Sequence, residues 1–340
     1  MVTGAPDDDQ RQDDPAADSS RDGDDATAGS LHDRLSSARD DFEHRVDRAR
    51  DQFDATNERI KKRTGRDLFA AIGVGVLAAA AVLASLLFVK WAFAILAVGI
   101  AALGVFELTR ALQARGRRID LVPQLIGAVI IVSAAFWFPT AVHWTAVFVT
   151  LAVIIVWRVL VQMSARDGRV YASIFSDIIV GCFIPLYVPF LASSALVLVR
   201  QDGGEMWIIA FLLVVVVADT AAYATGLSFG RHKMAPRISP GKTWEGFAGA
   251  AVVSNIAGIA AAIFLLGIPW WTGIIIALAL LGSATMGDLG ESMIKRDLGI
   301  KDMSSWLPGH GGVLDRLDSI LPSAVVALAL FHFLSPLGAA

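Results

Sequence analysis

The residues best able to do chemistry lie in one polar segment, 292–318, between two runs that are almost entirely apolar. It holds four cations, four carboxylates and three glycines around a histidine: Lys295, Arg296, Lys301 and Arg316; Asp297, Asp302, Asp315 and Asp318; and Gly309, Gly311 and Gly312 around His310. Cations with glycines suit a polyphosphate, because glycine lets backbone N–H groups approach the oxygens. Paired carboxylates suit the divalent metal ion that accompanies one. A plain solvated loop, the simpler alternative, would not mix both charge signs with a Pro-Gly-His-Gly-Gly turn.

A second polar group precedes this segment. It comprises Asp219-Thr220-Ala221-Ala222-Tyr223 and Ser239-Pro240-Gly241-Lys242-Thr243-Trp244-Glu245-Gly246. In its second part, the hydroxyls of Ser239 and Thr243 and the ammonium of Lys242 stand just before an expected helix, whose N-terminus would attract phosphate. A turn that starts a helix, with Glu245 in the first turn, is the structural alternative, and the two interpretations are compatible.

Four carboxylates fall within or at the ends of apolar runs: Asp219, Asp288, Asp177 and Glu107. A charge at membrane depth costs several kcal/mol unless it is paired or hydrated. We therefore expect all four to open onto one cytoplasmic cavity. For Asp177 and Glu107 we favour a structural role, in an ion pair with an arginine such as Arg110.

The motifs resemble the signature of phosphatidate cytidylyltransferases (CDP-diacylglycerol synthases), Ser-x-x-Lys-Arg, four residues, Lys-Asp, then His-Gly-Gly-x-x-Asp-Arg-x-Asp. The pattern begins at Ser292 and ends at Asp318 without a gap or a substitution. The segments 219–223 and 239–246 resemble two further family motifs, with Ala221 where glycine is common. The resemblance covers about residues 66 to 337.

The resemblance implies an enzyme that transfers CMP from CTP to phosphatidate, giving CDP-diacylglycerol and pyrophosphate, in phospholipid biosynthesis. It implies Mg²⁺ bound by Asp288 and Asp315, and leaves room for a second, monovalent cation. His310 would hydrogen-bond a phosphate rather than act as a base, because phosphatidate is already largely a dianion at neutral pH. The expected catalytic residues are Asp288, Asp315, Lys295, Arg296, Lys301 and Arg316, and the expected substrate-binding residues are Ser239, Lys242, Thr243, His310, Gly311, Gly312 and Asp219.

Composition places these motifs in a membrane. Of the 340 residues, 55% are hydrophobic, and the mean hydropathy is +0.59, values that belong to an integral membrane protein. We predict an all-α, polytopic protein with a polar cavity that faces the cytoplasm. Its nine spans, each near the roughly 20 residues that cross a bilayer, are expected at about 68–89, 91–110, 121–138, 141–161, 175–199, 206–226, 246–267, 270–287 and 319–337.

The N-terminal part differs sharply from the rest. Seventeen of the 32 acidic residues lie in the first 66 positions. We predict a cytoplasmic acidic tail over 1–66, disordered at first and then an amphipathic helix over 31–60, before a transmembrane cytidylyltransferase domain over 67–340. That helix could form a coiled coil, lie on the membrane, dock a partner or stay solvated. No sustained basic surface appears, so a nucleic-acid partner is not expected.

Basic residues predict the orientation. With the N-terminus in the cytoplasm, the inner segments hold twenty lysines and arginines and the outer ones only Lys90 and Arg200, while seven more lie in the tail. This positive-inside bias places the motif loops at the cytoplasmic face of the cell membrane. A homodimer is compatible with the sequence, which does not fix the oligomeric state.

Two other functions are less consistent with the sequence. A CTP-dependent kinase of a lipid alcohol, such as a polyprenol or phytol, would transfer the γ-phosphate, but the complete signature argues against it. A transporter would be expected to have polar groups at the bilayer midplane and symmetry between its halves, and the sequence has neither.

Overall fold

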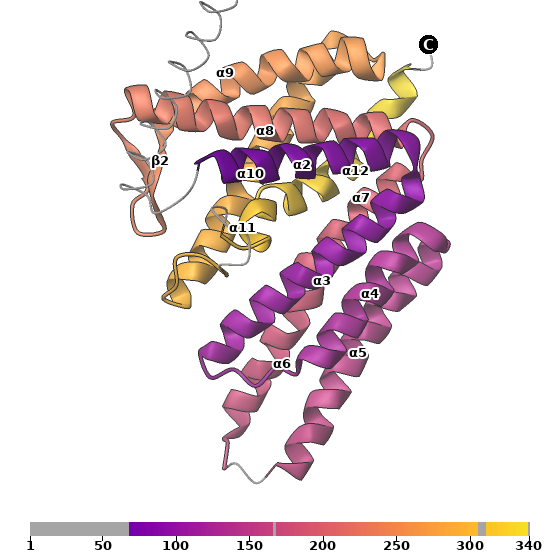
Figure 1. Cartoon of the computed structure of the whole chain (residues 1–340), viewed down its shortest axis with the longest axis vertical. Helices are drawn as coiled ribbons and strands as arrows, with labels where there is room; N and C mark the ends of the chain where they lie inside the picture. The colour runs from indigo at the N-terminus through magenta and orange to yellow at the C-terminus, as the bar shows by residue number, and fades with distance from the viewer. Residues whose placement is uncertain (1–67, 166–167, 305–310, 339–340) are drawn as a thin grey trace, which may run out of the picture. The chain divides into compact units, whose positions relative to one another are not determined.

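The computed structural model describes residues 68–165, 168–304 and 311–338, so the predictions for the tail 1–66 and for His310 lie outside the described residues. The described chain is mainly helical (Figure 1). A π-helical turn, Leu186–Phe190, joins α6 (Tyr171–Pro185) to α7 (Leu191–Val199), and another, Ala261–Leu266, extends α9 (Trp244–Ala260). The helices are α2 (Leu68–Phe88), α3 (Lys90–Ala114), α4 (Leu121–Trp137), α5 (Thr140–Ser164), α6 (Tyr171–Pro185), α7 (Leu191–Val199), α8 (Gly204–Phe229), α9 (Trp244–Ala260), α10 (Trp270–Asp297), α11 (Leu314–Leu317) and α12 (Ile320–Leu334).

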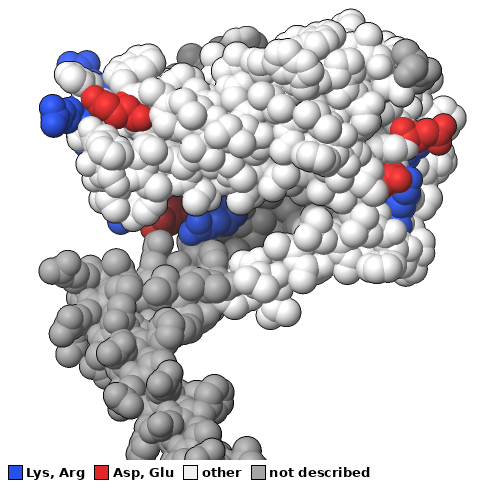
Figure 2. Space-filling model, turned by 90° about the horizontal axis from the view of Figure 1, so that it is seen from above, with Lys and Arg blue, Asp and Glu red and all other residues white. Residues whose placement is uncertain are grey.

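The helices are those of a polytopic membrane protein. Within the described residues, seven helices are long and apolar enough to cross a bilayer, and two shorter apolar helices, Gly75–Phe88 and α4, stand at the first and third predicted spans. The all-α, polytopic prediction is confirmed, while the number of helices that cross stays a prediction. On the face in Figure 2, charged side chains gather near two edges and in a recess, and a broad area between them is uncharged. Such a division is expected where lipid covers the helices.

Small residues let the helices α8, α9 and α10 approach one another closely. A Cβ atom added to Gly273 of α10 would lie 2.5 Å from the carbonyl oxygen of Gly258 on α9, so neither position has room for a side chain. At Gly249 of α9 an added Cβ would overlap the side chain of Thr225 on α8. Such crossings are typical of membrane helices, which associate through backbone contact. They hold α8, α9 and α10 together, and α8 and α10 carry three of the candidate site's carboxyl groups, those of Asp219, Asp288 and Glu291.

A β-hairpin, absent from the sequence prediction, connects α8 to α9. Its strands β1 (Lys233–Ala235) and β2 (Ser239–Thr243) are antiparallel. The hydroxyl of Thr243 then accepts the backbone N–H of Gly246 at 3.1 Å and caps α9, which has Glu245 in its first turn. The expected helix start is therefore confirmed, and Lys242 lies on a strand that ends at this cap.

Helix α10 is longer than predicted. The expected span ended at residue 287, whereas the helix continues to Asp297. Polar pairs four residues apart support the extra turns: Ser292 donates to Asp288 at 3.3 Å, and Lys295 lies 3.3 Å from Glu291. The first part of the signature is thus helical, and its side chains have fixed directions.

Contacts between connecting segments fall into two groups. At one end, Arg169 donates to the carbonyl oxygen of Gly116 at 2.7 Å, which joins the α5–α6 connection to the α3–α4 connection. At the other end, Lys90 pairs with Glu205 at 2.8 Å. These two groups match the inner and outer segments that the distribution of lysines and arginines predicts. Which set faces the cytoplasm stays a prediction.

Asp177 is paired with arginines, as predicted, but not with Arg110. Its carboxylate, 1% exposed, lies 3.2 Å from Arg158 of α5 and also pairs with Arg169. Arg110 instead donates to Gln113 at 3.3 Å. Among the described residues, the ion pairs of Asp177 are with Arg117, Arg158 and Arg169, which lie outside the carboxylate cluster described below. This differs from the expectation of one shared cavity.

Substitution of Asp177 should destabilise the fold. In Asp177→Asn the buried Arg158 loses its counter-charge, which typically costs about 3–5 kcal/mol. We expect a clearly lower melting temperature in detergent, followed by intrinsic tryptophan fluorescence. Asp202→Asn, which removes an exposed carboxylate, is the control, and equal melting temperatures for the two variants would contradict the structural role of Asp177.

Candidate active site

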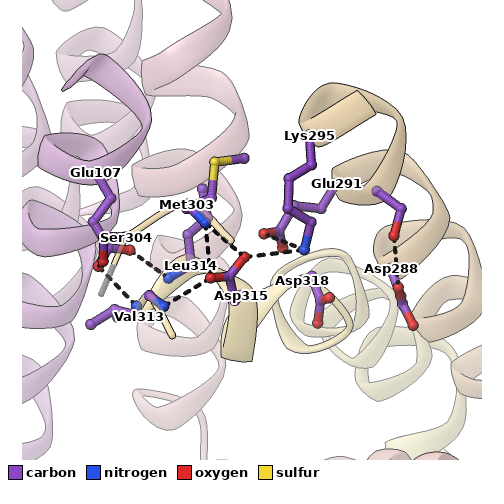
Figure 3. Close-up of polar contacts among 12 residues, drawn as sticks. Glu107, Asp288, Glu291, Lys295, Met303, Ser304, Val313, Leu314, Asp315 and Asp318 are labelled. Atoms are coloured by element: carbon purple, nitrogen blue, oxygen red, sulfur yellow. Dashed lines mark hydrogen bonds and ion pairs between the residues drawn. The ribbon is translucent and has the colours of Figure 1, made fainter. Parts of the chain in front are cut away.

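One face of α10 carries the central residues of the site. Asp288, Glu291, Ser292 and Lys295 are three or four residues apart, so their side chains project from the same side of the helix. Figure 3 shows Asp288, Glu291 and Lys295 along this helix, facing the segment that carries Asp315. The extension of α10 beyond its predicted end therefore positions the site.

Asp315, on α11, is the partner that holds Lys295. The ammonium of Lys295 donates to one carboxylate oxygen at 3.1 Å, and the backbone N–H groups of Gly312 and Met303 donate to the other at 2.8 and 3.0 Å. Gly311, which precedes Gly312, has a φ of 82°, in the left-handed region that favours glycine. Asp315 is only 8% exposed, and these donors compensate for its burial.

Glu291 is a site residue to which the sequence analysis gave no role. Its carboxylate is fully buried, and neither oxygen has a hydrogen-bond partner among the described residues. Lys295 lies 3.3 Å away, so the lysine is held between Glu291 and Asp315. The spacing of four residues between Glu291 and Lys295 predicts a contact between them on a helix. That prediction requires α10 to continue past residue 287, where the expected span ended.

Lys242 forms the second lysine–carboxylate pair. It reaches from β2 to Asp288, with 2.6 Å between the ammonium and the carboxylate. Asp219, on α8, accepts a hydrogen bond from the hydroxyl of Ser319 at 3.0 Å. Asp219 and Asp318 lie close enough to Asp288 for their like charges to repel. Residues from α8, β2, α10 and α11 with the turn after it thus form one charged cluster.

The cluster becomes less accessible from one end to the other. The exposed fraction of the side chain falls from 31% at Asp288 and 23% at Lys242 to 13% at Lys295 and 0% at Glu291. A charged ligand that arrives from water therefore meets the Lys242–Asp288 pair before the Lys295–Asp315 pair. The inner pair is also less screened by solvent and acts more strongly on a bound charge.

The structure brings together five of the predicted site residues: Asp219, Lys242, Asp288, Lys295 and Asp315. The others are placed differently. Arg296 donates from Nε to the carbonyl oxygen of Ile238 at 3.2 Å, so it ties the hairpin to α10. Lys301 and Arg316 are exposed, and Ser239 begins β2. The catalytic and binding roles of all these residues stay predictions.

Glu107, on α3, supports the signature segment. Among the described residues no arginine forms an ion pair with it, contrary to the prediction. Its carboxylate accepts the backbone N–H groups of Val313 and Leu314 at 3.0 and 2.9 Å, and the hydroxyl of Ser304 (Figure 3). A Cβ atom added to Gly312 would lie 2.8 Å from this carboxylate, so position 312 has no room for a side chain. Glu107 therefore joins the residues on both sides of segment 305–310 to one helix.

The carboxyl groups of the cluster outnumber its ammonium groups. Among the described residues, these contacts place five carboxyl groups, those of Asp219, Asp288, Glu291, Asp315 and Asp318, around two ammonium groups, those of Lys242 and Lys295. Their oxygens are the ligands that Mg²⁺ prefers, and Asp288 and Asp315 each already hold a cationic group. No three His, Cys, Asp or Glu side chains form a ready metal site within the described part of the chain. Mg²⁺ thus stays a prediction.

Comparison with known proteins identifies the family of the chain. Residues 69–334 match the cytidylyltransferase family, a range that includes every residue of the cluster. The chain belongs to the cytidylyltransferase family. The family resemblance inferred from the signature is therefore confirmed.

Its relatives include several bacterial proteins. The phosphatidate cytidylyltransferase of Mycobacterium leprae is 37% identical over 280 residues, which cover 80% of this chain and 90% of the relative. That of Mycobacterium bovis is 38% identical over 274 residues, or 78% and 88% of the two chains. The phosphatidate cytidylyltransferase of Pseudomonas aeruginosa is 36% identical over 215 residues, or 61% and 70%.

The role of Glu107 can be tested by Glu107→Gln. The amide keeps one acceptor, but its NH₂ group would face a backbone N–H, so the position of Asp315 relative to Lys295 should change. We expect turnover of CTP to fall about tenfold, with the melting temperature measured in parallel to confirm folding. Glu205→Gln is the control, because Glu205 pairs with Lys90 at the other end of the helices. Normal turnover in folded Glu107→Gln would show that the hydrogen bonds to Glu107 do not position Asp315.

Proposed function

We propose that this membrane enzyme transfers the CMP group of CTP to phosphatidate, giving CDP-diacylglycerol and pyrophosphate. The observation that carries the proposal is the pair of lysine–carboxylate contacts, Lys242–Asp288 and Lys295–Asp315, within one cluster. The relatives named phosphatidate cytidylyltransferase support the choice of substrates.

The reaction needs positioning and charge neutralisation more than proton transfer. A phosphate oxygen of phosphatidate attacks the α-phosphorus of CTP and forms a new P–O bond. The bond from that phosphorus to the oxygen that bridges to the β-phosphorus breaks, and its electron pair leaves with pyrophosphate. Because phosphatidate is already largely a dianion, no general base is required. In-line placement and electrostatic stabilisation can supply the acceleration.

The two lysines are suited to the triphosphate. Lys242, the more exposed, would meet the anionic nucleotide first, and Lys295 would stabilise charge deeper in the cluster. Both are held by carboxylates in advance, so little reorganisation is needed when a phosphate oxygen arrives. Arg296, Lys301, Arg316 and the hydroxyl of Ser239 remain proposed contacts of the substrates around this centre.

Asp288 and Asp315 are the proposed holders of Mg²⁺. When bound, the metal ion would neutralise phosphate oxygens and stabilise the departing pyrophosphate. The remaining carboxyl groups, Asp219, Glu291 and Asp318, leave room for a second, monovalent cation. They also retain both lysines near the metal ligands.

We place the site at the cytoplasmic face of the cell membrane, because the segments around it hold twenty of the 29 lysines and arginines. The headgroup of phosphatidate must reach the cluster while its acyl chains stay in hydrocarbon. Drawing the chains into water would cost about 0.8 kcal/mol per CH₂. The proposal therefore requires an opening between helices, beside the cluster, toward the inner leaflet.

Labelled CTP tests the reaction. Purified protein in detergent, with Mg²⁺ and phosphatidate, should transfer label to the lipid from [α-³²P]CTP and none from [γ-³²P]CTP, which should instead yield labelled pyrophosphate. The products are separated by thin-layer chromatography. Transfer of the γ-label to a lipid would replace the proposal with a CTP-dependent lipid kinase.

The metal-binding pair gives a second test. Asp288→Asn and Asp315→Asn should each lower turnover about a hundredfold or more, because an amide binds Mg²⁺ weakly and no longer balances its lysine. Initial rates are measured over a range of Mg²⁺ concentrations. Asp202→Asn should keep normal turnover, and a variant of Asp288 or Asp315 that does the same would remove that residue from the proposed metal site.

A further inference from the structure

An open pocket lies where the end of α8, the β-hairpin and the start of α9 meet. Its volume is about 390 Å³, and pockets that bind small molecules measure roughly 300–1,000 Å³. Its described lining comes from the last two residues of α8, the turn 230–232 and Glu245, and includes none of the five residues of the charged cluster. The pocket is therefore a separate place where part of a substrate can bind.

Close backbone contacts fix this pocket beside the hairpin. A Cβ atom added to Gly230 would lie 2.2 Å from the carbonyl oxygen of Gly226 and 2.8 Å from the side chain of Thr243, so position 230 has no room for a side chain. The backbone N–H of Trp244 donates to the carbonyl oxygen of His232 at 2.9 Å. The end of α8 and the end of β2 therefore lie side by side, and the pocket opens next to both.

Glu245, in the first turn of α9, gives the pocket a partly exposed acceptor. Its carboxylate accepts the backbone N–H groups of Arg231 and His232, each at 3.1 Å, and its Oε1 lies 2.6 Å from the ring Nδ1 of His232. The side chain of Glu245 is 26% exposed. A carboxylate has about four acceptor positions, so these three donors leave one for a ligand.

Two further side chains of the pocket suit a flat heterocycle. Phe229 is 71% exposed, so its ring has a free face. Nucleobases stack on aromatic rings of this kind in proteins that bind single strands. The exposed guanidinium of Arg231 offers several N–H donors. A stacking surface, a donor and an acceptor are together the groups that recognise a nucleobase.

From this juxtaposition we infer that the pocket binds the cytosine base of CTP, an inference that rests on the proposed function. The ring stacks on Phe229, its amino group donates to the carboxylate of Glu245, and its carbonyl oxygen accepts from Arg231. A carboxylate that accepts from the amino group of cytosine distinguishes it from uracil, which has a carbonyl oxygen at that position. Glu245 is thereby the residue that selects CTP over UTP.

The pocket lies beside the more exposed of the two lysine–carboxylate pairs. Lys242 precedes Glu245 by three residues, so their Cα atoms are at most about 11 Å apart. From Lys242 to Lys295 the exposed fraction of the side chain falls from 23% to 13%. A nucleoside triphosphate carries its base at one end and its charge at the other. The base can therefore stay in the open pocket while the phosphates reach the lysines.

Binding of labelled nucleotides tests the inference without turnover. The full chain in detergent, with Mg²⁺ and no phosphatidate, is dialysed to equilibrium against [α-³²P]CTP or [α-³²P]UTP. We expect the wild type to bind CTP at least about tenfold more tightly than UTP. In Glu245→Gln this preference should fall about tenfold, because the amide can donate to the carbonyl oxygen of uracil. A displaced hairpin would weaken both nucleotides alike and leave the preference unchanged.

Phe229→Leu tests stacking without removing a polar group. Because stacking does not depend on the edge of the base, the Kd values of CTP and UTP should both rise about tenfold. Phe333→Leu is the matched control, since Phe333 on α12 is 74% exposed and lies outside the pocket. Arg237→Gln removes an exposed arginine of the hairpin outside the pocket, and both controls should bind the two nucleotides like the wild type.

Three results would each overturn the inference: equal binding of CTP and UTP by the wild type, an unchanged preference in folded Glu245→Gln, and unchanged Kd values in folded Phe229→Leu. Folding is checked by the melting temperature, and Phe229→Leu decides if Glu245→Gln does not fold. The measurement requires no transfer to lipid. Selective binding of CTP by a protein that transfers no label to phosphatidate would therefore contradict the proposed reaction and leave the base pocket in place.

Discussion

The ammonium of Lys295 lies between the carboxylates of Glu291 and Asp315, and the candidate site depends on this interaction. Glu291 is fully buried, and an isolated charge there would be strongly unfavourable. Each of the three groups is tolerated because the other two are present. The interaction joins α10 to α11, two elements separated by the connection that contains most of the signature, and so fixes their relative position.

The same constraint explains why the site is assembled from several parts of the chain. Charges near hydrocarbon must be paired, and the partners come from different elements: β2 supplies Lys242, α10 supplies Asp288, and α11 supplies Asp315. The hairpin is itself held to α10 by Arg296. Loss of one charged residue would therefore disturb elements that are distant in the sequence.

The sequence was sufficient for the helices and for most of the cluster, because long apolar runs and closely spaced motifs are local signals. It was insufficient for Glu107, whose partner Leu314 lies 207 residues further along the chain. Ser319 gave no signal for its hydrogen bond to Asp219, since a serine at a helix start has many roles. The end of α10 was placed too early because hydropathy falls at residue 287. The pairs that continue the helix there, such as Glu291 with Lys295, are electrostatic.

Glu107 has one further consequence, which concerns entropy. Ser304 and Val313 both bind its carboxylate, so the chain between them leaves and returns at nearly the same point. The entropic cost of closing that loop is therefore met when the protein folds, and the nucleotide does not have to meet it again on binding. Because closure entropy changes only slowly with length, a change in the number of residues before Gly311 would alter this cost only slightly. Because Glu107 anchors both ends of the loop, a change within the loop need not change the stability of the helices that carry it.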